Sequence, residues 1–285
     1  MKRNPNTDAQ EAIKIIQNNT QNTYGHKDFK GYNPCYKFSN ENISEYYPEK
    51  IKNALTVCGS GDQVLCAILN GAQKIDCFDS NPLTYYTMML KIYLIKNLDY
   101  ETFLDFYSLS NNTSSQKNIY NIIHIDNEVV RIFWDEVFKN TPDIEKIFNK
   151  NDDKSESLFK GIPYLNKENF YKLKSIIDNC EINFITCDIF EIFKHFTQEY
   201  DFINFSNIFD YLSDISSTLK YAKLIIDAKT NHLTNNGTII VNYSWNKMHT
   251  TETVELISGL LPNPQQKNIQ STIENDTNSI LYHKK

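Results

Sequence analysis

Hydrophobic positions along the chain follow two periodicities that alternate. Short apolar runs bounded by polar residues or glycine predict strands at 55–58, 75–78, 183–188, 200–205, 238–243 and 279–283. Apolar residues at helical spacing predict helices, chiefly at 9–17, 63–70, 83–97, 214–232 and 251–260. The helix at 83–97 is expected to bury one face. Because strands that alternate with helices are typical of a parallel sheet covered on both faces, we expect a single Rossmann-like α/β domain over residues 1–285.

The alternation is interrupted between residues 98 and 180. Helical spacing recurs there at 100–107, 119–138 and 167–177, with polar stretches between these segments. We expect region 98–180 to be a helical insertion that forms a lid or substrate domain over the carboxyl edge of the sheet. Residues 1–53 precede the first strand, and we expect them to fold back over the site as a cover segment.

The first predicted strand ends in a glycine turn, Cys58-Gly-Ser-Gly-Asp62, and the side chain of Asp62 could cap the following helix. The second strand ends at Asp79, about 20 residues after the turn, where a carboxylate can accept both hydroxyls of a ribose. Glycines let the backbone pass close to a ligand. A nucleoside is therefore expected across the ends of these two strands. The residues predicted to bind it here are Gly59, Ser60, Gly61, Asp79, Ser80 and Asn81.

A Gly-x-Gly turn also occurs without any ligand, so the surrounding residues must show whether it binds one and of which class. Val64 stands at the third glycine of the dinucleotide fingerprint, which argues against NAD or FAD. No Gly-Lys-Ser/Thr follows, so a triphosphate-binding loop is excluded. A nucleoside without phosphates remains, and S-adenosylmethionine is the commonest such cofactor on this architecture.

Several short segments, in the same order, resemble one family. They are 38–42, 55–63, 70–74, 78–82, 90–91, 98–103, 164–169 and 205–211. These segments are similar to the diacylglycerol 3-amino-3-carboxypropyl transferases of betaine-lipid synthesis and their small bacterial relatives. The resemblance implies the class I methyltransferase fold, S-adenosylmethionine as cofactor, and transfer of the 3-amino-3-carboxypropyl group.

In this fold further residues face the cofactor. Asp188 could accept a hydrogen bond from the adenine amino group while the backbone of Ile189 contacts a ring nitrogen, and helix capping is the alternative role for Asp188. Ser206 and Asn207 follow the fourth strand, beside the reactive carbon. The segment from Ser39 to Asn42 is a candidate for the methionine end, with an Asn-rich surface turn as the alternative.

The leading functional interpretation is an S-adenosylmethionine-dependent transferase that moves an aminocarboxypropyl group to a small-molecule or lipid-like acceptor. Asp210 and Tyr243 are candidates for the catalytic base that a hydroxyl acceptor would need. An ordinary methyltransferase would use the same cofactor residues. A non-catalytic nucleoside-binding protein is the alternative from another class.

Composition limits the partners and the location. The net charge is −6 with acids and bases mixed along the chain, so no nucleic-acid partner is expected. The first residues are polar and no run approaches the 18 or so apolar residues of a membrane span, so we expect a cytoplasmic protein, still compatible with contact at a membrane surface. The six cysteines and six dispersed histidines predict reduced thiols and no metal site. The oligomeric state does not follow from the sequence.

Overall fold

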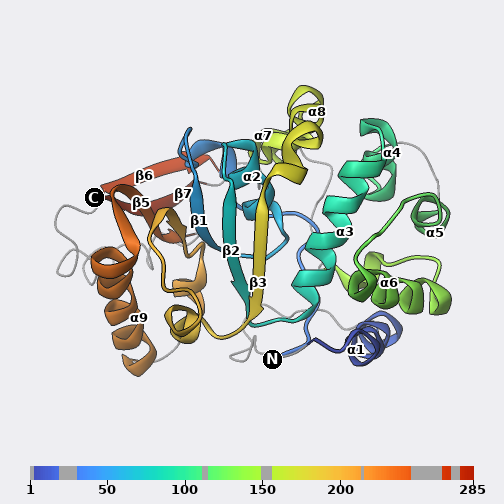
Figure 1. The fold of residues 1–285 in the computed structure, drawn as a ribbon, viewed down its shortest axis with the longest axis horizontal. Helices are drawn as coiled ribbons and strands as arrows, with labels where there is room; N and C mark the ends of the chain where they lie inside the picture. Colours follow the sequence, from blue (N-terminus) through green and yellow to red (C-terminus); the bar gives the residue numbers. More distant parts are fainter. Residues whose placement is uncertain are drawn as a thin grey trace.

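The computed structural model describes residues 3–18, 31–110, 115–148, 156–212, 215–244, 265–270 and 277–285. One seven-stranded sheet forms its centre, in the order β3-β2-β1-β4-β5-β7-β6 (Figure 1). The strands are β1 (Asn53–Val57), β2 (Lys74–Asp79), β3 (Glu181–Thr186), β4 (Tyr200–Asn204), β5 (Leu233–Ser244), β6 (Gln265–Gln270) and β7 (Thr277–Lys284). Strands β1 to β5 are parallel, and β7 is antiparallel to both of its neighbours. The predicted Rossmann-like α/β sheet is confirmed.

Helices cover both faces of the sheet, and alternate strand residues point into two separate cores. In β1, Ala54 belongs to the core that contains residues of α2 (Asp62–Leu69), whereas Leu55 belongs to the core that contains residues of α9 (Ile215–Asp227). Helix α8 (Lys167–Ile176) packs beside α2. Helix α9 also packs against η5 (Ile189–Lys194) and the π-helical turn η7 (Ala228–His232). This two-sided burial explains the short, nearly continuous apolar runs of the parallel strands.

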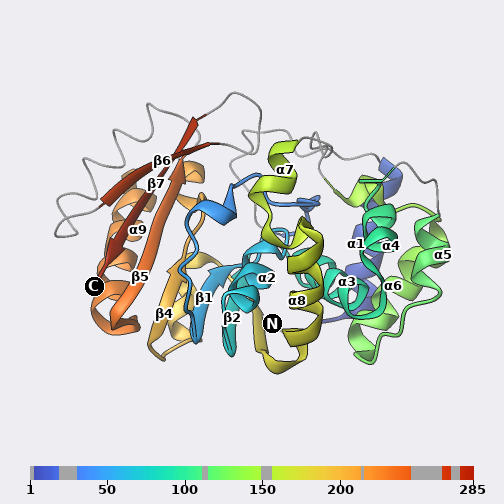
Figure 2. The same cartoon turned by 90° about the horizontal axis from the view of Figure 1, so that it is seen from above.

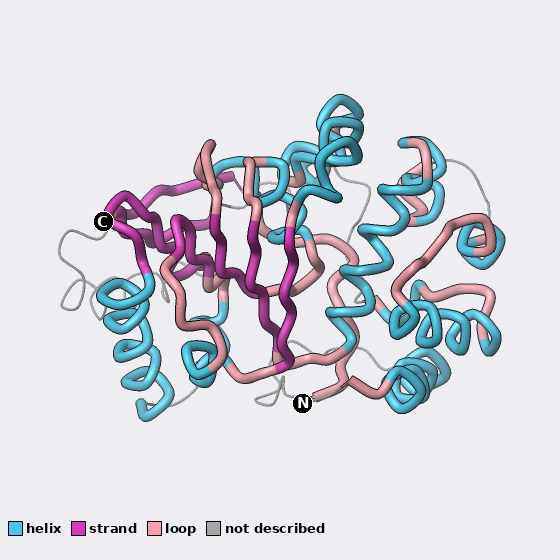
Figure 3. Tube along the Cα trace, in the orientation of Figure 1, coloured by secondary structure: helices cyan, strands magenta, loops and turns pink. Residues whose placement is uncertain are grey.

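The helical region between β2 and β3 lies largely beyond the β3 edge of the sheet, together with α1 (Figures 1 and 2). Its elements are α3 (Leu83–Asn97), α4 (Tyr100–Phe106), α5 (Gln116–Tyr120), α6 (Glu128–Asn140), η2 (Glu145–Ile147), α7 (Glu156–Gly161), η3 (Pro163–Leu165), α8 and η4 (Ile177–Asn179). In the orientation of Figure 1, Figure 3 shows the strands gathered in one part of the molecule and α3, α4, α5 and α6 to one side.

Helix α3 corrects one expectation of the sequence analysis. Spacing predicted a single buried face, but most of the helix is buried around its circumference. The reason is that α3 packs against both α6 and α8, and a helix that is apolar all round belongs between layers.

Two other elements differ from prediction. The single helix expected over 119–138 is divided into α5 and α6, because the side chain of Asn127 caps α6 by accepting a hydrogen bond from the Val130 backbone N–H at 3.1 Å. Strand β6 was not predicted, because its sequence is polar and contains a single hydrophobic residue, the buried Ile269, which gives no alternating pattern. The helix expected at 251–260 lies outside the described residues.

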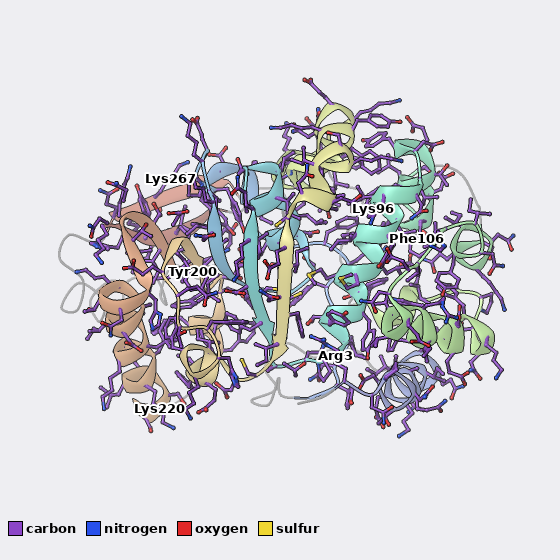
Figure 4. All side chains as sticks on the ribbon, in the orientation of Figure 1. Arg3, Lys96, Phe106, Tyr200, Lys220 and Lys267 are labelled. Atoms are coloured by element: carbon purple, nitrogen blue, oxygen red, sulfur yellow. The ribbon has the colours of Figure 1, made fainter. Side chains whose placement is uncertain are left out.

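Helix α1 (Pro5–Asn18) is fastened to the helical region by a buried carboxylate. Asp8 accepts hydrogen bonds from the hydroxyls of Tyr86 at 2.6 Å and Tyr32 at 2.5 Å, and α1 packs along α6. Just before the helix, the guanidinium of Arg3 donates to the Phe184 carbonyl of β3 at 2.6 Å and lies 3.7 Å from the centre of the Tyr85 ring (Figure 4). These contacts tie the first described residues to α3 and β3.

The described residues contain no candidate membrane-spanning helix, no candidate metal site and no disulfide. No helix among them is long and apolar enough to cross a membrane. Within the same part of the chain, no group of three or more His, Cys, Asp or Glu side chains is arranged to hold a metal ion. All six cysteines are free thiols.

Replacement of Asp8 by alanine should lower the free energy of unfolding by about 1 to 3 kcal/mol, because the buried Tyr86 hydroxyl loses its acceptor. Urea denaturation followed by circular dichroism measures this change. The matched control is Glu11→Ala on the same helix, where a surface pair with Lys14 at 2.6 Å is removed; it should cost less than about 0.5 kcal/mol. Equal losses in the two variants would show that Asp8 does not fasten α1.

Candidate functional site

A cavity of about 650 Å³ opens at the carboxyl ends of β1 to β4. Between β1 and β4 the strand order reverses, and open α/β sheets bind ligands at such a point. The lining comes from residues 33–36, 39–41, 57, 59, 60, 63, 78–81, 84, 187–190, 206–208, 211, 212 and 217. None of the described residues of region 98–180 lines the cavity. In the structure, these residues pack beside the sheet and against α2, and they do not form a wall of the cavity.

Asp79 is fixed at the end of β2 by two backbone hydrogen bonds. Its carboxylate oxygens accept from the Gly59 N–H and the Asn81 N–H, both at 2.9 Å. Burial raises the pKa of the Asp79 carboxyl to about 6, although these two bonds oppose the increase. Above that pH the group is a carboxylate, held in place beside the cavity, that can accept hydrogen bonds from paired hydroxyls.

The two glycines of the turn have different tasks. Both have a left-handed backbone, with φ of 54° at Gly59 and 84° at Gly61, which favours glycine. A Cβ on Gly59 would meet no protein atom within 4 Å, and Gly59 and Ser60 line the cavity. A Cβ on Gly61 would lie 3.0 Å from the Met88 side chain. Gly61 therefore allows α3 to pack closely and is not among the lining residues.

Asp62 does not cap α2, which corrects the sequence prediction. The N-cap position is Gly61, which has no side chain to cap the helix. The Asp62 carboxylate is buried and forms an ion pair with Lys91 at 2.7 Å, because it points into the protein toward α3. It also accepts hydrogen bonds from the Tyr164 hydroxyl, from Ser60 Oγ at 2.8 Å and from the Ser39 N–H at 2.5 Å.

A buried polar network forms the wall between the cover segment and the ends of β1 and β4. Glu41 lies at its centre and accepts from the Tyr46 hydroxyl at 2.5 Å, from Gln63 Nε2 at 2.7 Å and from the Ser206 hydroxyl. Gln63 in turn accepts from Asn204 Nδ2 at 2.8 Å. Burial, with Glu41 nearby, raises the pKa of Tyr46 well above its ordinary value, so Tyr46 remains a donor. Glu41, Gln63 and Ser206 line the cavity, where their positions are set by these mutual contacts.

Ser206 has an unusual backbone for a residue other than glycine, with φ of 53°. The Asn204 side chain accepts from the Ser206 N–H at 2.8 Å, and the Ser206 carbonyl accepts from the Tyr243 N–H at 2.9 Å. A left-handed conformation costs energy, and such strain is common at functional sites. The turn aims the loop that follows β4 into the cavity.

The structure brings most of the predicted cofactor-binding residues to the cavity. The members that line it are Gly59, Ser60, Asp79, Ser80, Asn81, Asp188, Ile189, Ser206 and Asn207. Asp188 also accepts from the Phe190 N–H at 3.0 Å and so caps η5. Asp188 therefore caps η5, which was the alternative role expected for it, and it also lines the cavity.

Besides Gly61, two predicted residues lie away from the lining, and the position of a third side chain is not described. Asn42 and Tyr243 do not line the cavity, and the Tyr243 hydroxyl accepts from the Asn42 N–H at 3.1 Å. Tyr243 is fully buried, so it supports the cover segment from behind. The backbone of Asp210 belongs to η6 (Ile208–Tyr211), but its side chain lies outside the part of the molecule that the structure describes.

Sequence reasoning did not single out the tyrosines at the cavity wall. Tyr36 comes from the cover segment and Tyr211 from η6, and their hydroxyl oxygens are 3.4 Å apart. Asn207 Nδ2 donates to the Tyr211 hydroxyl at 3.3 Å. An isolated tyrosine carries no spacing signal, so only the position of Tyr211 within the segment 205–211 could have pointed to it.

Comparisons with known proteins found similarity in structure only. No protein-family profile and no curated protein matches the sequence. The chain is similar to the N-methyltransferase NodS from Bradyrhizobium japonicum, solved with S-adenosyl-L-homocysteine, with 8% identity, a TM-score of 0.40, and 85% of this chain and 81% of that chain covered. An rRNA methylase from Streptococcus thermophilus has 8% identity, a TM-score of 0.40, and coverage of 85% and 92%. Spermidine synthase from Thermotoga maritima has 10% identity, a TM-score of 0.39, and coverage of 82% and 53%. Similarities of this size transfer neither a ligand nor an activity, and the betaine-lipid resemblance stays a prediction.

Proposed function

We propose that the protein is an S-adenosylmethionine-dependent transferase. The observation that carries this proposal is the carboxylate of Asp79, held at the end of β2 by the Gly59 and Asn81 N–H groups beside a cavity of about 650 Å³. A carboxylate at this position can accept the two hydroxyls of a ribose. The cavity volume lies within the range of small-molecule and cofactor sites.

The lining suggests how the cofactor lies. With the ribose on Asp79, the adenine extends toward Ile189 and Phe190 beyond β3, where apolar side chains can contact the ring. The opposite direction leads past Ser60 toward Ser39 and the Glu41 network. The methionine chain is placed there, because serine, asparagine and carboxylate groups can hydrogen-bond its amine and carboxylate. The sulfonium then lies near Ser206 and Asn207.

We further propose transfer of the 3-amino-3-carboxypropyl group, on the strength of the family resemblance. The acceptor forms a bond to the γ-carbon of the methionine chain, the bond from that carbon to sulfur breaks, and sulfur keeps the electron pair, which leaves 5′-methylthioadenosine. Alignment of acceptor, carbon and sulfur is the chief requirement. Tyr36, Ile208, Tyr211 and Leu212 give one part of the lining an apolar and aromatic character, which suits a small-molecule or lipid-like acceptor. Asp210 remains our candidate base.

Product analysis tests the transferred group. After incubation with S-adenosylmethionine and cell extract, mass spectrometry should find 5′-methylthioadenosine above a no-protein control and above heat-inactivated protein. If S-adenosylhomocysteine forms instead, the protein is a methyltransferase and the aminocarboxypropyl proposal is wrong. Tight cofactor binding with neither nucleoside formed would favour the non-catalytic nucleoside-binding alternative.

Replacement of Asp79 by alanine tests the ribose contact. Loss of a hydrogen-bonded pair to a buried ligand should cost about 2 kcal/mol, or about thirtyfold in affinity for S-adenosylmethionine by calorimetry. Asp178→Ala is the control, because that carboxylate is exposed and pairs with Lys96 at the surface. Unchanged affinity in the Asp79 variant would overturn the assignment.

The raised pKa of Asp79 predicts a pH-dependent affinity for 5′-methylthioadenosine, which has no amino-acid chain. Protonation converts one carboxylate oxygen to a donor, so binding weakens as the pH falls through about 6. Between pH 7 and pH 5 the dissociation constant should rise about tenfold. Isothermal titration at several pH values measures this, and the slope should disappear in Asp79→Asn. A flat profile in the wild-type protein would contradict the role of the carboxylate.

A further inference from the structure

The ion pair of Asp62 and Lys91 lies beneath the cavity without lining it. The Lys91 ammonium donates three hydrogen bonds: to Asp62 Oδ1 at 2.7 Å, to the Ser60 carbonyl at 2.9 Å and to the Lys37 carbonyl at 2.8 Å. Asp62 Oδ2 accepts from Ser60 Oγ at 2.8 Å and from the Ser39 N–H at 2.5 Å. Both charges therefore contact the same two segments, the glycine turn and the cover segment.

These two segments form the walls at one end of the cavity. Ser39 and Ser60 line it, and they come from parts of the chain that share no secondary-structure element. One carboxylate oxygen of Asp62 accepts hydrogen bonds from both serines, and the Lys91 ammonium donates to the carbonyls of Ser60 and Lys37. The spacing between the walls is thus set by one ion pair.

The other end of the cavity is fixed by different contacts. Asp79 is held by the Gly59 and Asn81 N–H groups, and Asp188 by the Phe190 N–H. Neither Asp62 nor Lys91 takes part in these bonds. A disturbance of the ion pair should therefore affect the Ser39 and Ser60 end more than the ribose and adenine end.

Burial makes the geometry of the pair strict. The side chains of Lys91 and Asp62 are 2% and 0% exposed, and buried charges are tolerated only when they are paired and hydrogen-bonded. A movement of either serine wall would leave a buried charge with fewer hydrogen-bond partners. Helix α3 also places the Lys91 ammonium 4.5 Å from the centre of the Phe38 ring, next to the cover segment.

We propose that Asp62 and Lys91 are positioning residues that set the affinity of the cavity for the amino-acid chain of its ligand, acting through Ser39 and Ser60. This inference rests on the proposed function, in which the chain of S-adenosylmethionine lies between those two residues. The pair contacts no ligand itself. It determines whether the two walls stand at the spacing that the amine and carboxylate require.

Two ligands that share the nucleoside and the sulfur separate positioning from general stability. S-adenosylhomocysteine carries the amino-acid chain, and 5′-methylthioadenosine carries a methyl group in its place. In Lys91→Met, calorimetry should show that affinity for S-adenosylhomocysteine falls about tenfold or more while affinity for 5′-methylthioadenosine changes less than about threefold. Leu90→Ala is the matched control, since Leu90 is a fully buried neighbour on α3 and its loss should lower the melting temperature without changing the ratio of the two affinities.

Further variants keep the test decisive if Lys91→Met folds poorly. The double variant Asp62→Asn with Lys91→Met leaves no unpaired buried charge, so its melting temperature should exceed that of Lys91→Met. Its affinity for S-adenosylhomocysteine relative to 5′-methylthioadenosine should still be lower than in the wild-type protein. Tyr164→Phe removes a single donor to Asp62 and should shift the ratio slightly in the same direction.

If the affinities for both ligands fall equally in these variants, the pair is merely structural and the inference is overturned, although the proposed function stands. If the wild-type protein binds neither ligand, the proposed function itself fails, and the inference with it.

Discussion

The buried ion pair between Asp62 and Lys91 joins segments that are distant in the sequence. It links the first turn of α2 to the middle of α3, and through hydrogen bonds it reaches Ser39 in the cover segment and Tyr164 in η3. Burial lowers the pKa of Lys91, and the contact with Asp62 opposes that decrease. Such a pair is stable only when each charge has several partners. The arrangement of the glycine turn, the cover segment and the helical region depends on it.

The cavity is built from loops whose positions are determined by side-chain contacts. The Glu41 carboxylate receives donors from Tyr46, Gln63 and Ser206, which belong to different parts of the chain. Removal of any one of these donors would leave a buried acceptor without a hydrogen bond, and this should lower the free energy of unfolding by about 1 to 3 kcal/mol. Mutual hydrogen bonding of this kind holds a strained residue such as Ser206 in place, and it keeps the walls rigid enough to align a ligand.

The helical region serves the fold more than the cavity. Helix α3 lies between the sheet and α6, the Tyr86 ring stacks on Phe133 of α6 at 3.8 Å between ring centres, and the Trp134 indole donates to the Tyr86 carbonyl at 3.0 Å. These contacts extend the hydrophobic core past β3. Stacked and edge-on aromatic rings add about 0.5 to 1.5 kcal/mol each beyond the area they bury. The described part of region 98–180 therefore supports the site from the side, through α3 and Tyr164.

Local sequence patterns determined the sheet and the position of Asp79, because apolar periodicity and glycine turns act within a few residues. They also placed Asp188 and Ser206 at strand ends that meet at one edge of the sheet. The polar strand β6 could not be predicted, since it pairs with β7 through its backbone and carries almost no apolar pattern. Likewise, the sequence predicted a helix cap at Asp62, whereas the structure has a buried ion pair there. Its partner Lys91 lies 29 residues away in sequence, and only the packing of α3 against the glycine turn and the cover segment brings the two charges together. The sequence by itself decided which strands form the site, whereas long-range contacts between buried polar groups, which have no local signature, decided how its walls are held.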